Sequence, residues 1–272
     1  MRPPTIPLPL PPGLAMRSGA GRSTGRVRPR NPWFPFETGE EASVRLLCLP
    51  HAGAGATVYR AWGRGLPATI AACPVQPPGR ETRRSEQPLT SAVEMARQLA
   101  PEVIRTVRPP YAIFGHSTGA LCAFEVVREI RRLNGPLPVH LFVAGRRPPS
   151  MPMIRTELAG LPADELAVVL RRLGGTPEEI LAEPFMLELI QPLLVADFHV
   201  NEMYSYHPEP RLPVPITAFA STRDHFAAPD QVAGWEQETS DRYAQLVLDG
   251  DHFAIFENSP VVLGRIAADL GT

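Results

Sequence analysis

Short apolar runs alternate with amphipathic segments along most of the chain, and this alternation predicts the fold. The runs that read as buried strands are 44–49, 70–75, 111–114, 139–144, 216–220 and 243–248. Helical patterns cover 91–107, with Ser91 as the N-cap, then 120–133 and 260–270, and a further helix is expected to begin within 57–62. Strands that alternate with helices in this way predict an α/β fold, with a mostly parallel central sheet and helices on both faces.

The alternation breaks between residues 157 and 206, where two helical patterns follow each other with no strand between them. These patterns are ADELAVVLRRLG and EPFMLELIQPLLVADF. A helical insertion between two strands of such a sheet is the usual place for a lid over a binding site. We therefore expect a mobile lid at about 157–206, although ordinary packing of these helices against the sheet would give the same pattern.

The first 32 residues differ from the rest, because they are rich in proline and arginine and contain no acidic residue. Such sequence cannot form a packed core, and we expect a disordered tail. A signal peptide is a weaker interpretation, since prolines interrupt the apolar run and no cleavage site follows. The expected domain organisation is a tail at 1–32 and one domain at 33–272.

Composition removes several classes of function. The formal net charge of -1 gives no reason to expect binding to nucleic acid. No apolar run is long enough to cross a bilayer, so no membrane partner is expected. The cysteines Cys48, Cys73 and Cys122 have no metal-binding or disulfide spacing, which suits buried free thiols in a reducing, cytoplasmic setting.

The candidate chemistry begins at Gly115-His116-Ser117-Thr118-Gly119, which matches the pattern G-x-S-x-G. This segment stands between a predicted strand and a predicted helix, where the sharp turn of an α/β hydrolase exposes the nucleophilic serine. The start of the helix adds N–H donors for a developing oxyanion. We therefore expect Ser117 to be the nucleophile, with a general base and an orienting acid elsewhere.

His252 is the expected base and Asp224 the expected acid, because each follows a predicted strand by a short loop. In α/β hydrolases the chain order is serine, acid, histidine, and these loops gather above the serine. The other histidines precede Ser117, open a strand, fall in or after the insertion, or adjoin the acid. Three rivals for the acid stay open, namely Asp230, Asp249 and Asp251, and the first is the most serious.

An oxyanion hole needs two backbone donors about 3 Å from the future oxyanion. One is expected from the N–H of Thr118, and the other from Ala52 in the glycine-rich turn His51-Ala-Gly-Ala-Gly55. A simple tight turn would have the same sequence. For the acyl group, the apolar insertion and the neighbourhood of the base make Met186, Leu189 and Phe253 candidate substrate-binding residues.

Several segments together resemble the type II thioesterases, which serve modular polyketide and nonribosomal peptide synthesis as stand-alone hydrolases. The resemblance covers roughly residues 33–270 and is carried by LPHAGAG, TVYRAW, PPGRETRR, GHSTGA, LGGTPEEIL, ADF, TRD and DHF, in that order. It implies the α/β-hydrolase fold and no metal or cofactor. It also implies acyl-loaded carrier proteins as partners, an editing role, the triad Ser117, Asp224 and His252, and the oxyanion donors Ala52 and Thr118.

Three positions depart from the pattern of that family. Thr118 stands where the family usually has Met, Val195 stands where it often has Arg, and Asp251 replaces a Gly beside the base. The last change adds a carboxylate that can affect the pKa of the base. Two other functions stay open, namely a general carboxylesterase or lipase with the same triad, and a partner that docks on carrier proteins without turnover.

Overall fold

A single six-stranded sheet organises the molecule. The computed structural model describes residues 31–36, 41–152 and 158–271. The sheet order is β2-β1-β3-β4-β5-β6, and every neighbouring pair is parallel. The strands are β1 (Val44–Leu49), β2 (Ile70–Pro74), β3 (Tyr111–His116), β4 (Leu141–Ala144), β5 (Ile216–Ser221) and β6 (Tyr243–Leu248). The expected α/β-hydrolase architecture is confirmed, and all six strands lie within two residues of their predicted bounds.

Alternate side chains of each strand feed two separate cores. In β1, Leu47 and Leu49 pack into the core under α1 (Ala92–Thr106) and α2 (Thr118–Arg132). The intervening Leu46 and Cys48 pack into the core on the opposite face. That face is covered by the short 3-10 turns η1 (Ala56–Tyr59) and η2 (Trp62–Arg64) and by α7 (Ala254–Glu257) and α8 (Ser259–Asp269). Because both faces are buried, the strands read as continuous apolar runs.

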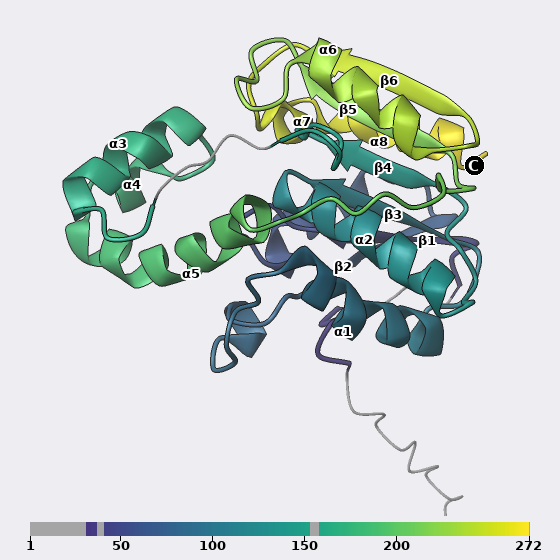
Figure 1. The fold of residues 1–272 in the computed structure, drawn as a ribbon, viewed down its shortest axis with the longest axis horizontal. Helices are drawn as coiled ribbons and strands as arrows, with labels where there is room; N and C mark the ends of the chain where they lie inside the picture. Colours follow the sequence, from purple (N-terminus) through teal and green to yellow (C-terminus); the bar gives the residue numbers. More distant parts are fainter. Residues whose placement is uncertain (1–30, 37–40, 153–157, 272) are drawn as a thin grey trace, which may run out of the picture.

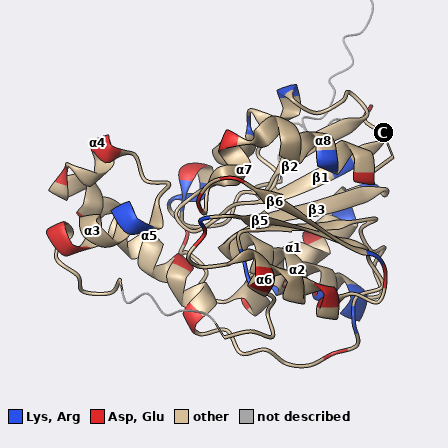
Figure 2. Cartoon of the chain, turned by 90° about the horizontal axis from the view of Figure 1, so that it is seen from above, with Lys and Arg blue, Asp and Glu red and all other residues tan. Residues whose placement is uncertain are grey.

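Three helices, α3 (Ala163–Leu173), α4 (Glu178–Leu181) and α5 (Pro184–Glu202), lie between β4 and β5 and form the helical insertion. In Figure 1, α3 and α4 stand well to one side of the sheet, while α5 runs back towards it. The insertion has a small apolar cluster of its own, which comprises Leu158, Leu166, Ala167, Leu170, Leu181, Leu187 and Leu194. Several of its acidic residues lie on α3 and α4, away from the sheet (Figure 2).

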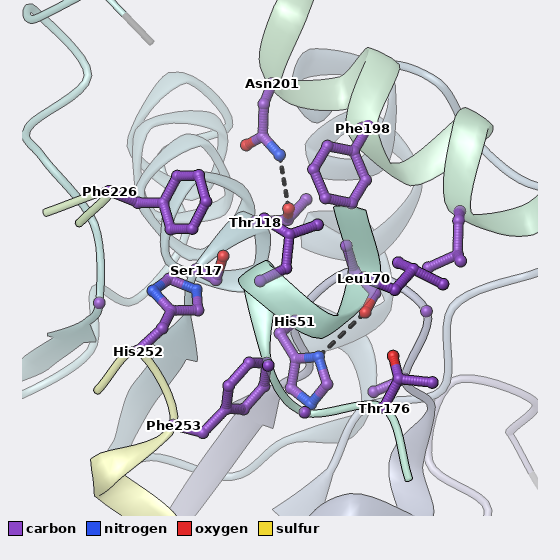
Figure 3. A pocket seen from close by; sticks show the side chains of 18 of the residues that line it. His51, Ser117, Thr118, Leu170, Thr176, Phe198, Asn201, Phe226, His252 and Phe253 are labelled. Atoms are coloured by element: carbon purple, nitrogen blue, oxygen red, sulfur yellow. Dashed lines mark hydrogen bonds between the residues drawn. The ribbon is translucent and has the colours of Figure 1, made fainter. Parts of the chain in front are cut away.

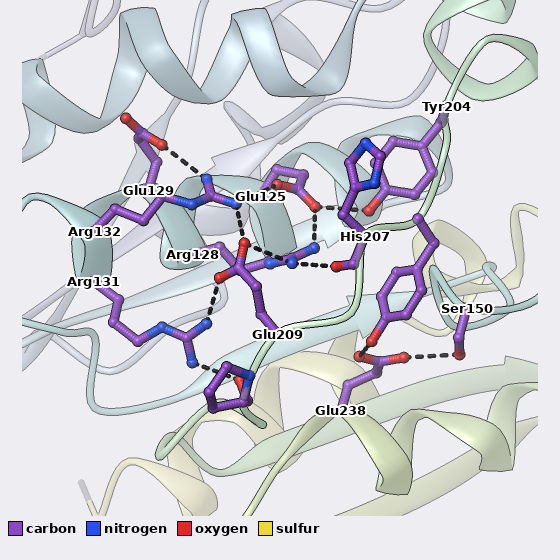
Figure 4. A network of polar contacts seen from close by, with 12 residues as sticks. Glu125, Arg128, Glu129, Arg131, Arg132, Ser150, Tyr204, His207, Glu209 and Glu238 are labelled. Atoms are coloured by element: carbon purple, nitrogen blue, oxygen red, sulfur yellow. Dashed lines mark hydrogen bonds and ion pairs between the residues drawn. The ribbon is translucent and has the colours of Figure 1, made fainter.

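The chain that leaves α5 is fixed to α2 by buried charged groups (Figure 4). Arg128 of α2 pairs with Glu125 at 2.8 Å and with Glu209 at 2.7 Å. The hydroxyl of Tyr204 donates to the same Glu125 at 2.7 Å. A buried ion pair that keeps several hydrogen bonds costs little free energy of folding, whereas loss of one partner leaves an uncompensated buried charge. The chain after α5 is thereby anchored to α2, the helix that follows Ser117.

The remaining elements differ from expectation in small ways. Where a helix was expected to begin within 57–62, the chain makes the turns η1 and η2 instead. The helix α4 was not predicted. The other short elements are η3 (Glu81–Arg83), α6 (Pro229–Val232) and η4 (Ala233–Glu238). None of the helices in the described ranges combines the length and apolar character needed to cross a bilayer.

The start of the described chain packs on the domain. Trp33 is buried in the α1 and α2 core, and the guanidinium of Arg83 lies 4.3 Å from the centre of its ring. Asn31 donates to Glu102 at 2.7 Å. The predicted domain boundary at residue 33 stays a prediction. The expectation of a disordered tail falls almost entirely on residues 1–30, which lie outside the described residues.

Candidate active site

The turn between β3 and α2 holds Ser117 in an unusual conformation, with φ 54° and ψ -119°. A non-glycine residue at positive φ is strained, and such strain gathers at functional sites. The flanking glycines are required by close approach of backbone. A Cβ on Gly115 would lie 2.2 Å from the carbonyl oxygen of Gly119, and one on Gly119 would lie 2.3 Å from that of Leu49. The pattern G-x-S-x-G thus follows from the space around the turn.

The structure joins His252 to Asp224 rather than to a rival acid. Nδ1 of His252 lies 2.8 Å from Oδ2 of Asp224, whose other oxygen accepts the backbone N–H groups of Phe226 and Ala227 at 2.8 and 3.3 Å. Asp224 is buried, so its carboxylate is held in one orientation. With Nδ1–H donated to the acid, Nε2 is the free basic nitrogen. Figure 3 shows the Ser117 hydroxyl beside the ring of His252.

The three rival acids are engaged elsewhere or exposed. Asp230 lies exposed at the start of α6. Asp249 accepts from the hydroxyl of Thr222 and pairs with Arg223, on the surface. Asp251, the departure beside the base, accepts the backbone N–H of Phe253 at 2.8 Å. Its carboxylate therefore shapes the turn that presents His252, which is a common use of Asp in turns.

Two further histidines lie close to the expected base: His116 contacts His252, and His51 contacts His116, and sequence reasoning assigned neither a role. Nε2 of His116 lies 2.9 Å from the carbonyl oxygen of His252 and fixes the backbone of the base. Burial holds the pKa of His116 well below its ordinary value, and burial lowers the pKa of His51 to about 4. Both rings are therefore neutral at pH 7, and they place no positive charge beside His252.

The residues expected to form the oxyanion hole line one cavity. Ala52 and Thr118 both line it, together with Ser117. Thr118 is the first residue of α2, where backbone N–H groups have no partner within the helix. The Ala52 turn is held by an ion pair that sequence reasoning did not assign. Asp197 accepts the N–H of Gly53 at 2.6 Å, and Arg80 binds both oxygens of that carboxylate at 2.7 and 2.8 Å.

The departure at Thr118 has a partner in the structure. Its hydroxyl lies 2.6 Å from Nδ2 of Asn201, and Oδ1 of Asn201 accepts from Arg146 at 2.5 Å (Figure 3). A Met at position 118 has no group that could accept this hydrogen bond in the same way. The other departure, Val195, packs half-buried against the apolar cluster of the insertion, where an Arg would need a polar partner.

The cavity has a volume of about 360 Å³. Ser117 lines it, and the insertion supplies much of the remaining lining. Of the three candidate substrate-binding residues, Phe253 lines the cavity. The Phe253 ring packs closely on Gly175, because a Cβ at position 175 would lie 2.2 Å from the ring. The structure does not place Met186 or Leu189 at the cavity: neither lines it, and Leu189 is 63% exposed. The apolar lining from the insertion comprises Leu170, Leu173, Ile180, Ile190, Leu193, Leu194 and Phe198.

Fold and site together define an α/β hydrolase with a nucleophile elbow. Residues 44–270 match the family model described as "Thioesterase domain". The gramicidin S biosynthesis protein GrsT of Aneurinibacillus migulanus is 36% identical over 229 residues, which are 84% of this chain and 90% of that protein. The chain belongs to the thioesterase family and is a thioester hydrolase.

Solved structures agree with this assignment. RedJ, a thioesterase of the prodiginine pathway in Streptomyces coelicolor, superposes with a TM-score of 0.80 at 33% identity, over 92% of this chain and all 100% of that chain. The type II thioesterase BorB of the borrelidin cluster gives a TM-score of 0.79 at 33% identity, over 88% and 98%. The resemblance to type II thioesterases is thereby confirmed.

Proposed function

We propose that this chain hydrolyses acyl groups held as thioesters on the phosphopantetheine arm of carrier proteins, as an editing enzyme of polyketide or nonribosomal peptide synthesis. The observation that carries the proposal is a single cavity onto which Ser117, His252, Ala52 and Thr118 all open. The similarity to GrsT and BorB supports a role in such a pathway, because GrsT is a gramicidin S biosynthesis protein and BorB is a type II thioesterase of the borrelidin biosynthetic cluster.

In the first half of the reaction, His252 takes the proton of Ser117 as the Oγ attacks the thioester carbonyl carbon. Negative charge develops on the carbonyl oxygen, which accepts from the N–H groups of Ala52 and Thr118. The C–S bond then breaks, and the carrier thiol leaves with the proton from His252. Asp224, bonded to Nδ1 at 2.8 Å, keeps the imidazole in the required tautomer.

The second half repeats these steps with water as the nucleophile. His252 takes a proton from the water, which attacks the acyl-Ser117 ester, and the acid product leaves as the proton returns to Ser117. The same oxyanion hole serves both tetrahedral intermediates. The apolar wall from α3, α4 and α5 provides a surface for the acyl chain.

The helical insertion acts as a lid in this proposal. It walls the cavity but keeps its own small core, so it can move relative to the sheet at limited cost in buried surface. A phosphopantetheine arm must pass this wall to deliver its thioester to Ser117. Opening of the insertion would then precede each turnover.

Turnover of three matched substrates tests the proposal. The same acyl group is offered on a carrier protein, on coenzyme A and as a simple oxygen ester, with Ser117→Ala as the blank. We expect the highest kcat/KM on the carrier protein. Equal rates on the oxygen ester would point instead to a general carboxylesterase. Loss of labelling by a serine-directed phosphonate, together with binding of the carrier protein, would point to a non-catalytic docking partner.

A further inference from the structure

Two polar residues of α5 lie one helical turn apart, and each contacts a different segment of the expected oxyanion hole, namely the glycine-rich turn or Thr118. Asp197 and Asn201 are four residues apart, so they share one face of the helix. Both are buried, at 4% and 8% exposure. They lie near the end of the helix that reaches the sheet, and a buried polar side chain there requires a hydrogen-bond partner.

Asp197 fixes the wall formed by the glycine-rich turn. Its Oδ2 accepts the N–H of Gly53 at 2.6 Å, directly after the proposed donor Ala52. Arg80 binds both oxygens of the carboxylate and also donates to the carbonyl oxygen of Ala54 at 3.2 Å. The turn is thus held at the two residues that follow Ala52, and the carboxylate that holds Gly53 belongs to the insertion.

Asn201 fixes the residue that supplies the other expected donor, Thr118. Arg146 can only donate, so its hydrogen bond at 2.5 Å requires the oxygen of the Asn201 amide on that side. The amide N–H then donates to the Thr118 hydroxyl at 2.6 Å. Within the described part of the chain, Nε of the buried Arg146 has no hydrogen-bond partner. The guanidinium therefore relies on Asn201, which has a single orientation available.

We propose that α5 positions both donors of the oxyanion hole, through Asp197 on the Ala52 turn and Asn201 on Thr118. When the helix is seated, the two N–H groups are set at the spacing that the oxyanion needs. When the insertion lifts, both contacts loosen and the hole is no longer assembled. The device rests on the proposed function, and it makes Asn201 and Asp197 positioning residues for the transition state, since neither needs to touch substrate.

The Thr118 hydroxyl offers a sharp test, because catalysis needs only the backbone N–H of that residue. Thr118→Val keeps the shape and the N–H but removes the acceptor for Asn201, whereas Thr118→Ser keeps the hydroxyl. We expect Thr118→Val to lower kcat about tenfold with KM changed less than about twofold, and Thr118→Ser to stay near wild type. Asn201→Leu should match Thr118→Val, and the double variant should be no slower than the slower single variant.

An oxyanion-forming inhibitor separates positioning from general loosening. An alkyl trifluoromethyl ketone adds to Ser117, its carbonyl oxygen becomes the oxyanion, and His252 keeps the proton. Its affinity should fall as much as kcat falls in Thr118→Val and Asn201→Leu. An S-alkyl pantetheine thioether has a methylene group in place of the thioester carbonyl, so it forms no oxyanion, and its affinity for these variants should not change. Asp197→Asn should lower kcat and ketone affinity about a hundredfold, since it loosens the other donor.

Gln191→Ala is the matched control on the same helix, because this side chain donates to the carbonyl oxygens of Leu158 and Leu161 inside the insertion. It should keep kcat within about twofold.

The inference is overturned by wild-type kcat in Thr118→Val, by additive loss in the double variant, or by an equal loss in Gln191→Ala. It is also overturned if thioether affinity falls with ketone affinity. Asn201→Leu leaves Arg146 without this hydrogen-bond partner, so melting temperatures are recorded for every variant. If Asn201→Leu does not fold, the comparison of Thr118→Val with Thr118→Ser decides the inference. If Ser117→Ala is as active as wild type, the proposed function itself fails instead.

Discussion

The central sheet and the helical insertion contribute to the same cavity but are built differently. Every residue of β1, β3, β4 and β5 is buried, and two extensive cores cover the sheet. The insertion buries one small cluster and leaves large apolar side chains exposed, with Val168 at 51% and Phe185 at 73%. The proposed catalytic residues belong to the first region, and most of the apolar lining of the cavity belongs to the second.

This contrast separates two tasks that one rigid body could not perform together. A nucleophile, a base and an acid must keep their spacing to within a fraction of an ångström, which favours turns at the ends of buried strands. Admission of a long acyl arm requires a part that can move, and small buried area allows it. The polar contacts at the end of α5 are the place where the moving part meets the fixed one.

The largest effect is expected at the fixed part. Ser117→Ala should lower thioester hydrolysis by more than about a thousandfold, because the acyl-enzyme can no longer form. The melting temperature should stay within about 2 °C, since the side chain has few packing partners to lose. Steady-state turnover and a thermal melt check both statements. Substantial residual hydrolysis would place the nucleophile elsewhere.

The acid gives the next effect in size. Asp224→Asn should lower kcat by about three to four orders of magnitude, because the amide can hold His252 in the wrong tautomer. Asp230→Asn is the matched control, since this exposed residue lies nearby in the chain and outside the site. Its kcat should change less than about twofold. An exchange of the two phenotypes would contradict the observed pairing of His252 with Asp224.

Hydrogen exchange compares the two regions directly. Amides of α3 should exchange at least about a hundredfold faster than those of β3, because opening the insertion exposes little buried surface, whereas opening β3 requires global unfolding. The measurement is exchange by mass spectrometry on the free protein. Equal protection in the two segments would exclude the insertion as a moving lid.

The smallest effect concerns selectivity at the wall of the cavity. Leu193→Trp should lower the ratio of kcat/KM for long over short acyl thioesters about tenfold, because Leu193 lines the cavity and a larger side chain shortens it. Leu189→Trp is the control one turn away on the same helix, because Leu189 is 63% exposed and does not line the cavity, and it should leave the ratio unchanged. The assay is competition between two acyl lengths. A shift of equal size in both variants would mean that the wall is not where the structure places it.

Much of the architecture could be predicted because its signals are local. The run YAQLVL at 243–248 forms β6 with the predicted bounds, and Ser91 accepts the N–H of Glu94 as the cap of α1. The elbow was recognisable because close backbone contacts allow only glycine at positions 115 and 119. The order of Ser117, Asp224 and His252 then followed from the order of strands in this fold.

Which turns of α5 meet the cavity could not be predicted from the sequence. Met186, Leu189, Ile190 and Leu193 are spaced i, i+3, i+4 and i+7, so they share one face of the helix, and the pattern made the first two as plausible as the last two. Only the seating of the helix decides which side chains are lining and which are exposed.

The sequence by itself determined the strands, the nucleophile turn and the residue types of the triad, because each depends on neighbouring residues in the chain or on a fixed chain order. The tertiary structure alone decided the contacts that join distant segments. Asp197 meets Gly53 across 144 positions, and Asn201 meets Thr118 across 83. An Asp or Asn on a helix carries no mark of its partner, because hydrogen bonds of this kind depend on how whole elements dock.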